Sequence, residues 1–337
     1  MPLVQEACNC RLRAVPLSVM EAGVKTATSV NGHARNGTPA LEVHLCREAF
    51  YTGRRLSGVV VLRLAKPVAI RSLTISVAGN EYPTGASLAR ALKPGGAFFD
   101  RELLLSGALQ PRLASDRLSL LWNSVLGRYK GRTLAAGEHT HPFSIPLPAS
   151  LPPSYEGRAG KIEYRVTARL QLATGRTIKD SRVIRVVFVP RLHRGRPVAV
   201  SYPTADGAVH STEIEVNIEL PDRMVAMGES VHGRLAISNP HGIAIPRVTA
   251  SLEVCEWVRL AVDKEIQRER VDTTAVKPRI PEASFIEADF SLRAPKSAPP
   301  SIEGTAISVI WLLKLSLETD PPIEFKTPIV VYSPVEG

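Results

Sequence analysis

The 337-residue chain lacks the features that mark several large classes of protein. It has only 4 cysteines, too few for the disulfide framework of a small secreted domain. No run approaches the roughly 18 apolar residues of a membrane-spanning helix, and the longest candidate, Ala306 to Leu313, ends at Lys314. The N-terminal residues hold no apolar stretch followed by a small-residue cleavage site, so no secretory signal is expected. These absences predict a cytoplasmic protein.

The sequence also lacks the common catalytic and nucleotide-binding motifs. It contains no phosphate-binding loop, no dinucleotide fingerprint opening a helix, no nucleophile elbow and no H-E-x-x-H zinc signature. The pairs Cys8/Cys10 and His139/His141 have a spacing that suits metal ligands, but neither pair has a further ligand nearby in the sequence. We therefore expect no enzyme activity, no metal site and no cofactor.

What the chain does contain is a series of segments with period-two hydrophobicity. From Ile162 to Leu172 every second residue is apolar, and similar alternation begins at Leu41, Leu73 and Ile214. Strict alternation places one face of a strand in a core and the other in water, as in antiparallel sheets. The 27 prolines suit the loops and strand edges of such a fold. The pattern predicts an all-β sandwich or barrel protein.

Two regions break this pattern. Residues 1–39 have no sustained period and end in a turn-rich run, which predicts a disordered extension. Between residues 83 and 137, apolar residues recur at helical spacing from Leu118 to Tyr129, behind the cap signal Ser115-Asp116. This spacing predicts a short amphipathic helix. We expect it to pack on its own sandwich, because it is short and has few basic residues for a membrane surface.

The most informative feature is an internal duplication. At an offset of 175 residues, the segment Gly53–Gly58 matches Gly228–Gly233, and the alignment continues to Glu81 and Glu256. At an offset of 147, the run P-P-S-Y-E-G that starts at Pro152 matches P-P-S-I-E-G. Both copies place a glycine in the first turn, where the backbone is expected to need a positive φ. Two homologous β-sandwiches in tandem explain these matches.

The duplication also sets the predicted domain boundaries. The first sandwich is placed at 40–190, the hinge at 191–197 and the second sandwich at 198–337. The predicted hinge residues are Pro190, Arg191, Gly195 and Pro197. Because this connection is short and bracketed by prolines, we expect the two lobes to keep a limited range of mutual angles.

An ordered set of motifs along residues 41–332 resembles the arrestin family. The set comprises F-Y-x-G-x-x-x-x-G-x-V-x-L from Phe50, the run from Ala136 to Ser144, and the P-P-S-Y-E-G turn followed by G-K-I-E-Y from Gly160. The resemblance is closer to α-arrestins and prokaryotic arrestin-like proteins than to receptor-regulating arrestins. It implies the arrestin fold, with two tandem immunoglobulin-like β-sandwiches and the predicted short helix inserted in the first. It also implies an adaptor or scaffold in protein sorting or signalling.

One motif allows two interpretations. Pro152-Pro153-Ser154-Tyr155 spells the PPxY sequence that α-arrestins carry in a C-terminal tail, where it docks the WW domains of ubiquitin ligases. The second copy of the turn has Ile302 in place of Tyr155, which favours a turn that enters a core strand. The sequence ends at Gly337, directly after the last expected strand, so we expect no PPxY tail.

The formal charge of +10 is unevenly distributed. Residues 40–196 carry 25 basic and 10 acidic side chains, a net charge of +15, whereas residues 197–337 carry a net charge of −7. A basic first lobe favours acidic or phosphorylated protein partners, because Arg forms charge-assisted hydrogen bonds with carboxylate and phosphate. The predicted partner-binding residues, expected to be neighbours, are Arg165, Arg169, Lys161, Arg63, Lys66, Arg54 and Arg55.

Other interpretations of the same charge stay open. The basic lobe could bind anionic lipid as a peripheral membrane protein, since each Lys or Arg near such a surface contributes about 1 kcal/mol. It could also simply attract the acidic second lobe. Nucleic-acid binding is disfavoured, because the second lobe is acidic and no nucleic-acid-reading motif is present.

Overall fold

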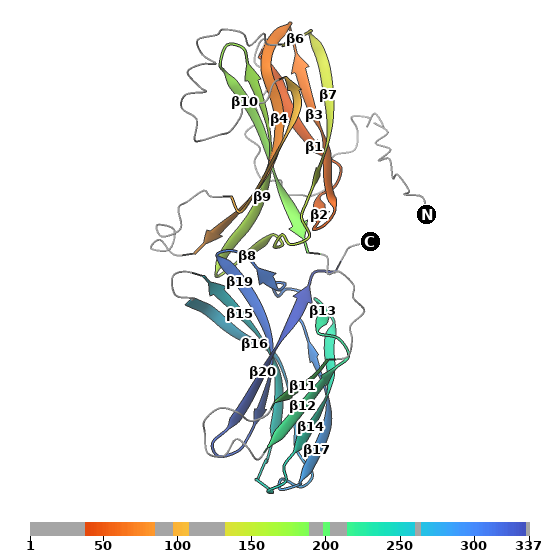
Figure 1. The fold of residues 1–337 in the computed structure, drawn as a ribbon, viewed down its shortest axis with the longest axis vertical. Helices are drawn as coiled ribbons and strands as arrows, with labels where there is room; N and C mark the ends of the chain where they lie inside the picture. Colours follow the sequence, from red (N-terminus) through yellow and green to blue (C-terminus); the bar gives the residue numbers. More distant parts are fainter. Residues whose placement is uncertain are drawn as a thin grey trace, which may run out of the picture.

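The computed structural model describes residues 38–84, 97–107, 132–188, 198–202, 214–259 and 264–334. Every element in these residues is a β-strand, which confirms the all-β prediction. The strands form two lobes that stand end to end along the long axis (Figure 1). The helix predicted near 115–129, the hinge residues Pro190, Arg191, Gly195 and Pro197, and most of the N-terminal extension lie outside the described residues.

The first lobe is a sandwich of two sheets. Its strands are β1 (Ala40–Leu45), β2 (Ala49–Tyr51), β3 (Arg55–Leu64), β4 (Val68–Pro83), β5 (Phe99–Gly107), β6 (Arg132–Leu134), β7 (Gly137–Pro146), β8 (Tyr155–Gly157), β9 (Gly160–Leu172) and β10 (Thr177–Val187). A three-stranded sheet has the order β1-β3-β7. A seven-stranded sheet has the order β2-β10-β9-β4-β5, with β6 beside β4 and β8 beside β9.

The second lobe repeats this plan. Its strands are β11 (Val198–Tyr202), β12 (Glu215–Leu220), β13 (Met224–Ala226), β14 (Ser230–Ser238), β15 (Val248–Val258), β16 (Lys264–Val276), β17 (Phe285–Arg293), β18 (Ile302–Glu303), β19 (Ile307–Leu317) and β20 (Ile323–Tyr332). The smaller sheet has the order β11-β12-β14-β17, and the larger has the order β13-β20-β19-β15-β16 with β18 beside β19. The prediction of two tandem sandwiches is thus confirmed.

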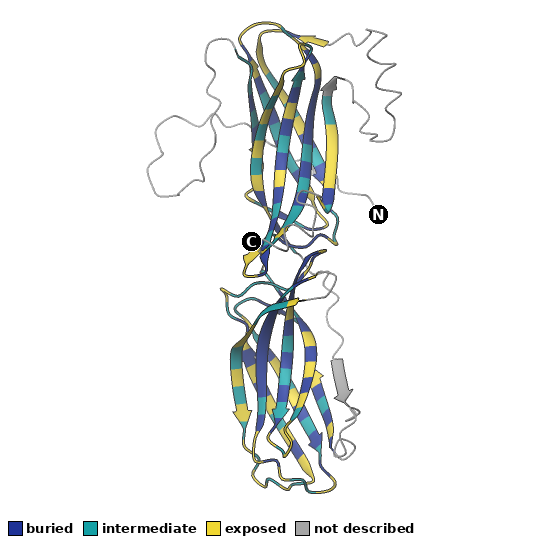
Figure 2. Ribbon diagram, turned by 90° about the vertical axis from the view of Figure 1, so that its left-hand side faces the viewer, coloured by how far each residue is buried: buried dark blue, intermediate teal, exposed yellow. Residues whose placement is uncertain are grey.

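The alternating residues form the two cores. Along β9 every apolar residue from Ile162 to Leu172 is buried, and the residues between them face outward. Figure 2 shows the same alternation as bands of buried and exposed residues along the strands of both lobes. Burial of one face of each sheet against the other is the main source of stability in such a sandwich.

Matching hydrogen bonds confirm the internal duplication. β2 runs parallel to β10, and β13 runs parallel to β20 in the same way. The turns that follow hold Gly53 at φ +73° and Gly228 at φ +91°, the left-handed region that glycine adopts without steric cost. The N–H of Gly53 donates to the carbonyl of Leu147 at 3.1 Å, and that of Gly228 donates to Ala294 at 2.7 Å.

The lobes differ at one edge of the smaller sheet. In the second lobe β11 pairs with β12, whereas no strand among the described residues pairs with the matching edge of β1. There the side chain of Asp180, from β10, accepts a hydrogen bond from the N–H of Val43 at 2.8 Å. By strand register, the residue equivalent to Asp180 is Phe325, which is buried. A capping carboxylate thus lies in the first lobe where the second has an added strand and an apolar side chain.

Candidate functional site

The predicted partner-binding residues fall on two opposite faces of the first lobe. Lys161, Arg165 and Arg169 lie on β9 and face outward from the seven-stranded sheet. Arg55 and Arg63 lie at the two ends of β3 and face outward from the three-stranded sheet. The structure therefore does not bring the predicted set together, because the outer faces of the two sheets in a sandwich point apart. Arg54 and Lys66 lie in the turns that precede and follow β3.

The cations of the three-stranded face are engaged by neighbouring side chains. Arg63 donates to Glu42 at 3.0 Å and to Glu138 at 2.9 Å. Hydrogen bonds to Glu138 and then to Glu42 raise the pKa of Arg63. Arg55 donates to the hydroxyl of Ser144 at 2.7 Å and to its carbonyl at 3.0 Å. These contacts tie β1, β3 and β7 together and leave fewer donors for a partner.

Part of the β9 charge is also neutralised. Glu163 lies between Lys161, at 2.8 Å, and Arg165, at 2.6 Å. Burial acts to raise the pKa of Glu163, but the hydrogen bonds from Lys161 and Arg165 outweigh it and hold this pKa below its usual value. Glu163 is therefore ionised at neutral pH and offsets one of its two cationic neighbours.

Arg169 is different, because it stands opposite another cation. The register of β9 and β10 places it directly across from Lys179, and both side chains are exposed. In the described part of the chain neither side chain makes a hydrogen bond or an ion pair. Like charges in directly opposed positions destabilise a sheet. Arg165, Arg169, Lys179 and Arg185 all point outward here, and we call them the β9–β10 face.

Lys179 and Arg185 were not among the predicted partner-binding residues. Both occupy alternate, outward positions of β10, and their period-two spacing was the available signal. Hydroxyl groups surround the opposed cations, since Thr74 of β4 faces Arg169 and the hydroxyls of Thr167 and Ser181 lie 3.0 Å apart. Cations among hydroxyl donors suit a phosphate or carboxylate group.

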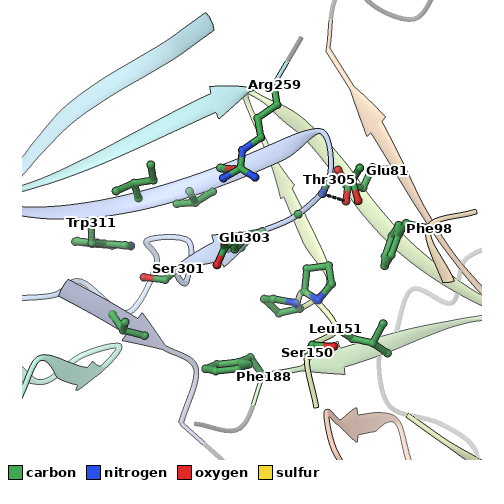
Figure 3. A pocket seen from close by; sticks show the side chains of 18 of the residues that line it. Glu81, Phe98, Ser150, Leu151, Phe188, Arg259, Ser301, Glu303, Thr305 and Trp311 are labelled. Carbon is green, nitrogen blue, oxygen red and sulfur yellow. Dashed lines mark hydrogen bonds between the residues drawn. The ribbon is translucent and has the colours of Figure 1, made fainter. Parts of the chain in front are cut away.

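A second group of polar contacts joins the two lobes. Glu81, at the end of β4, accepts hydrogen bonds from the backbone N–H groups of Thr305 at 2.7 Å, Ala306 at 2.5 Å and Ile307 at 2.9 Å. Figure 3 shows Glu81 directed at Thr305 in the turn between β18 and β19. In return Glu256, from β15 of the second lobe, accepts hydrogen bonds from the N–H of Ala159 at 2.8 Å and from the hydroxyl of Tyr155.

The Pro-Pro-Ser-Tyr motif is part of this contact. Tyr155 is only 6% exposed, and burial followed by the hydrogen bond to Glu256 raises the pKa of its hydroxyl. The Ser154 hydroxyl accepts from the N–H of Val186 at 2.9 Å, and its counterpart in the second lobe, Ser301, accepts from Val331 at 2.9 Å. The motif is therefore a structural turn shared by both copies.

An open cleft of about 840 Å³ lies beside these contacts. Its walls include Glu81, Phe98 and Phe188 of the first lobe and Arg259, Glu303 and Trp311 of the second (Figure 3). The walls are mainly apolar. Among the described residues no group of three or more His, Cys, Asp or Glu is placed to hold a metal ion.

The part of the chain that the structure describes contains no helix long and apolar enough to cross a bilayer. Cys46 is exposed and Cys255 is buried. His139 hydrogen-bonds to the carbonyl of Ala135 at 2.8 Å, and burial, then the neighbouring charges of His139 and Arg132, lower the pKa of His141.

Fold and contacts together define a protein of two tandem β-sandwiches joined by reciprocal polar contacts. The family model described as arrestin (or S-antigen), N-terminal domain, matches residues 42–192. The first lobe of the chain therefore carries an arrestin N-terminal domain.

Relatives of the chain carry the same domain. An arrestin domain-containing protein of Schizosaccharomyces pombe is 25% identical over 53% of this chain. The HECT-type ubiquitin ligase-interacting protein apyA of Emericella nidulans is 27% identical over 52% of the chain, and the human arrestin domain-containing protein 1 is 28% identical over 42%. The matches cover 28%, 44% and 27% of the relatives' own lengths, so the chain spans less than half of each.

Proposed function

We propose that this protein is a cytoplasmic adaptor without enzymatic activity, and that it binds acidic or phosphorylated segments of protein partners on the β9–β10 face. The observation that carries the proposal is the pair Arg169 and Lys179, two exposed cations that stand opposite each other and have no counter-ion among the described residues. Such a pair costs the free protein stability, and a bound anion would remove that cost. A role in protein sorting or signalling fits the adaptor function that the resemblance to arrestins implies.

The geometry suits an extended peptide. Directly opposed side chains on neighbouring antiparallel strands have Cβ atoms about 4.5–5.5 Å apart, so one phosphate or carboxylate can contact both. Arg169 offers a planar guanidinium for two parallel hydrogen bonds, and Lys179 adds a compact charge. Four residues further along β10, opposite Arg165, Val183 is 56% exposed and offers an apolar contact to another residue of the peptide.

The relatives support a role in protein binding. One of them is, by its name, a protein that interacts with a HECT-type ubiquitin ligase. A contact of that kind in this chain would need a segment other than the Pro152–Tyr155 turn, because the Tyr155 ring is buried between the lobes.

Affinity purification from the native host, followed by mass spectrometry, tests the proposal. We expect Arg169→Glu/Lys179→Glu to lose the partners that wild type captures, and phosphatase treatment to release those held by phosphate. Arg63→Glu is the matched control, since it also reverses a basic side chain but lies on the opposite sheet. A partner list that is unchanged by the double substitution would overturn the proposal.

A vesicle assay separates the lipid alternative. Wild type and the double variant are sedimented with phosphatidylserine vesicles and with neutral vesicles at low salt. The proposal expects no binding that depends on Arg169 and Lys179. Binding to the anionic vesicles that the double substitution abolishes, without loss of protein partners, would replace the peptide with a lipid surface.

A further inference from the structure

The contacts between the lobes repeat the internal duplication. Glu81 and Glu256 are equivalent residues at the 175-residue offset, and Ala159 and Ala306 are equivalent at the 147-residue offset. Each carboxylate accepts a hydrogen bond from the equivalent alanine N–H of the opposite lobe. This reciprocity, in which one patch binds its own counterpart, defines a twofold contact between identical subunits. Here it occurs within one chain.

We propose that Glu81 and Glu256 are positioning residues that hold the two lobes at one mutual orientation. The two residues thereby fix the position of the second lobe relative to the β9–β10 face. The relevance of that position to partner binding rests on the proposed function, whereas the orientation itself does not. A single contact between two bodies leaves a pivot, whereas two separate contacts oppose rotation about either. The structure supplies two, one on each side of the pseudo-twofold axis.

Both carboxylates bind the opposite lobe. Among the described residues, the Glu81 carboxylate accepts hydrogen bonds only from the turn before β19 and from the first residue of β19, and the Glu256 carboxylate accepts only from Tyr155 and Ala159. Hydrogen bonds from several N–H groups to one ionised carboxylate are among the strong polar contacts of proteins. Neither carboxylate is needed to close its own sandwich, so the pair acts on the arrangement of the lobes.

Glycine makes the close approach possible in both copies. A Cβ on Gly304 would lie 2.7 Å from the Glu81 carboxylate oxygen, and one on Gly157 would overlap the Tyr155 hydroxyl. The two glycines are equivalent at the 147-residue offset. The glycine repeated in both turns is thus explained by the space that the opposite carboxylate and its partners need.

Tyr155 compensates for a difference between the two halves of the contact. Glu81 accepts from three backbone N–H groups, but Glu256 accepts from one. The Tyr155 hydroxyl supplies Glu256 with a second donor, which Ile302, the equivalent residue in the second lobe, cannot do for Glu81. This accounts for a tyrosine in only one of the two copies.

Distances between two spin labels, measured on the full chain, test whether Glu81 and Glu256 hold the lobes at one mutual orientation. One label is placed at Arg176→Cys, in the turn after β9, and the other at Glu287→Cys, on β17, with Cys8, Cys10 and Cys46 replaced by Ser. Wild type is expected to give one narrow distance distribution. Glu81→Gln/Glu256→Gln is expected to at least double its width. Both oxygens of Glu81 accept hydrogen bonds, so a Gln there turns its amide N–H group toward a backbone N–H donor, and both Gln side chains lack the negative charge that strengthens the remaining hydrogen bonds.

Glu303→Gln is the matched control, since Glu303 also lines the cleft but its side chain makes no hydrogen bond or ion pair among the described residues. Its distribution should equal that of wild type. An unchanged distribution in the double variant would overturn the proposal. If that variant does not fold, as judged by circular dichroism, Tyr155→Phe decides instead, since it removes one hydroxyl and should give an intermediate width. No partner is needed, so failure of the proposed function leaves this result standing.

Discussion

The outer faces of the two larger sheets occupy equivalent places in the duplication but differ in chemistry. On the first lobe the outward residues include Lys161, Glu163, Arg165 and Arg185; on the second, their equivalents are Ser308, Ile310, Leu312 and Val330. The inward residues between them stay large and apolar in both lobes. The duplicated strands therefore kept what the core requires, while these outward positions diverged from charged residues in the first lobe to mostly apolar ones in the second.

The lobes also treat outward charge differently. In the second lobe Glu253, only 4% exposed, lies 3.4 Å from Arg268, 3.6 Å from Arg270 and 3.9 Å from Lys314. Its equivalent in the first lobe is Ala78. The second lobe thus neutralises its outward cations with a buried carboxylate, whereas the first leaves Arg169 and Lys179 without one. This difference supports the proposal that the first lobe binds an external anion.

The largest loss of stability is expected from substitutions in the hydrophobic cores, and the equivalent core positions of the two lobes should respond alike. Tyr164 and Trp311 are equivalent and fully buried, and they donate to the carbonyls of Pro152 at 2.6 Å and Pro299 at 3.0 Å. Replacing either by Ala should destabilise its lobe by about 3–5 kcal/mol, because a large side chain and its hydrogen bond are lost. Urea unfolding followed by circular dichroism measures this. A loss under about 1 kcal/mol in only one lobe would show that the interiors are not equivalent.

A smaller loss of stability is expected at Glu253, where the first lobe has the uncharged Ala78. Glu253→Ala gives the second lobe the residue of the first and leaves three cations without their shared carboxylate. Because those cations are partly solvated, we expect a loss of about 1–3 kcal/mol, less than for a fully buried pair. Urea unfolding at low and high salt checks it, and the loss should shrink as salt screens the repulsion.

Glu265→Ala is the control for that experiment. Glu265 pairs with Arg268 at 2.8 Å but is more exposed than Glu253, so its loss should stay under about 1 kcal/mol. Equal losses from the two substitutions would contradict a special role for the buried carboxylate.

The smallest expected effect is a change in the pKa of Glu163, the acidic residue between Lys161 and Arg165 in the basic first lobe. The pKa of Glu163 lies below its usual value, so its contribution to stability is present at neutral pH and is lost as the pH falls through that lowered pKa. Carboxyl-carbon NMR should find a depressed pKa in wild type and a value closer to ordinary glutamate in Lys161→Gln/Arg165→Gln. The idea fails if the double substitution leaves this pKa unchanged.

Several parts of this structure could be predicted because they depend on local pattern. The alternation in β9 correctly placed its buried residues, and the P-P-S repeat correctly indicated a turn. The partner-binding set was less well predicted, since Arg63 and Arg169 belong to different sheets and Lys179 was missed. The sequence shows which residues of a strand share a face, but it does not show which strand lies beside which.

By itself the sequence determined the all-β class, the duplication and the uneven charge of the two halves. These follow from spacing along the chain, where period two and a fixed offset are visible without a fold. Only the tertiary structure decided that Arg169 opposes Lys179, and that Glu81 meets an N–H group more than 220 residues away. The physical reason is that strand register and contacts between lobes arise from packing between distant segments, which local pattern does not encode.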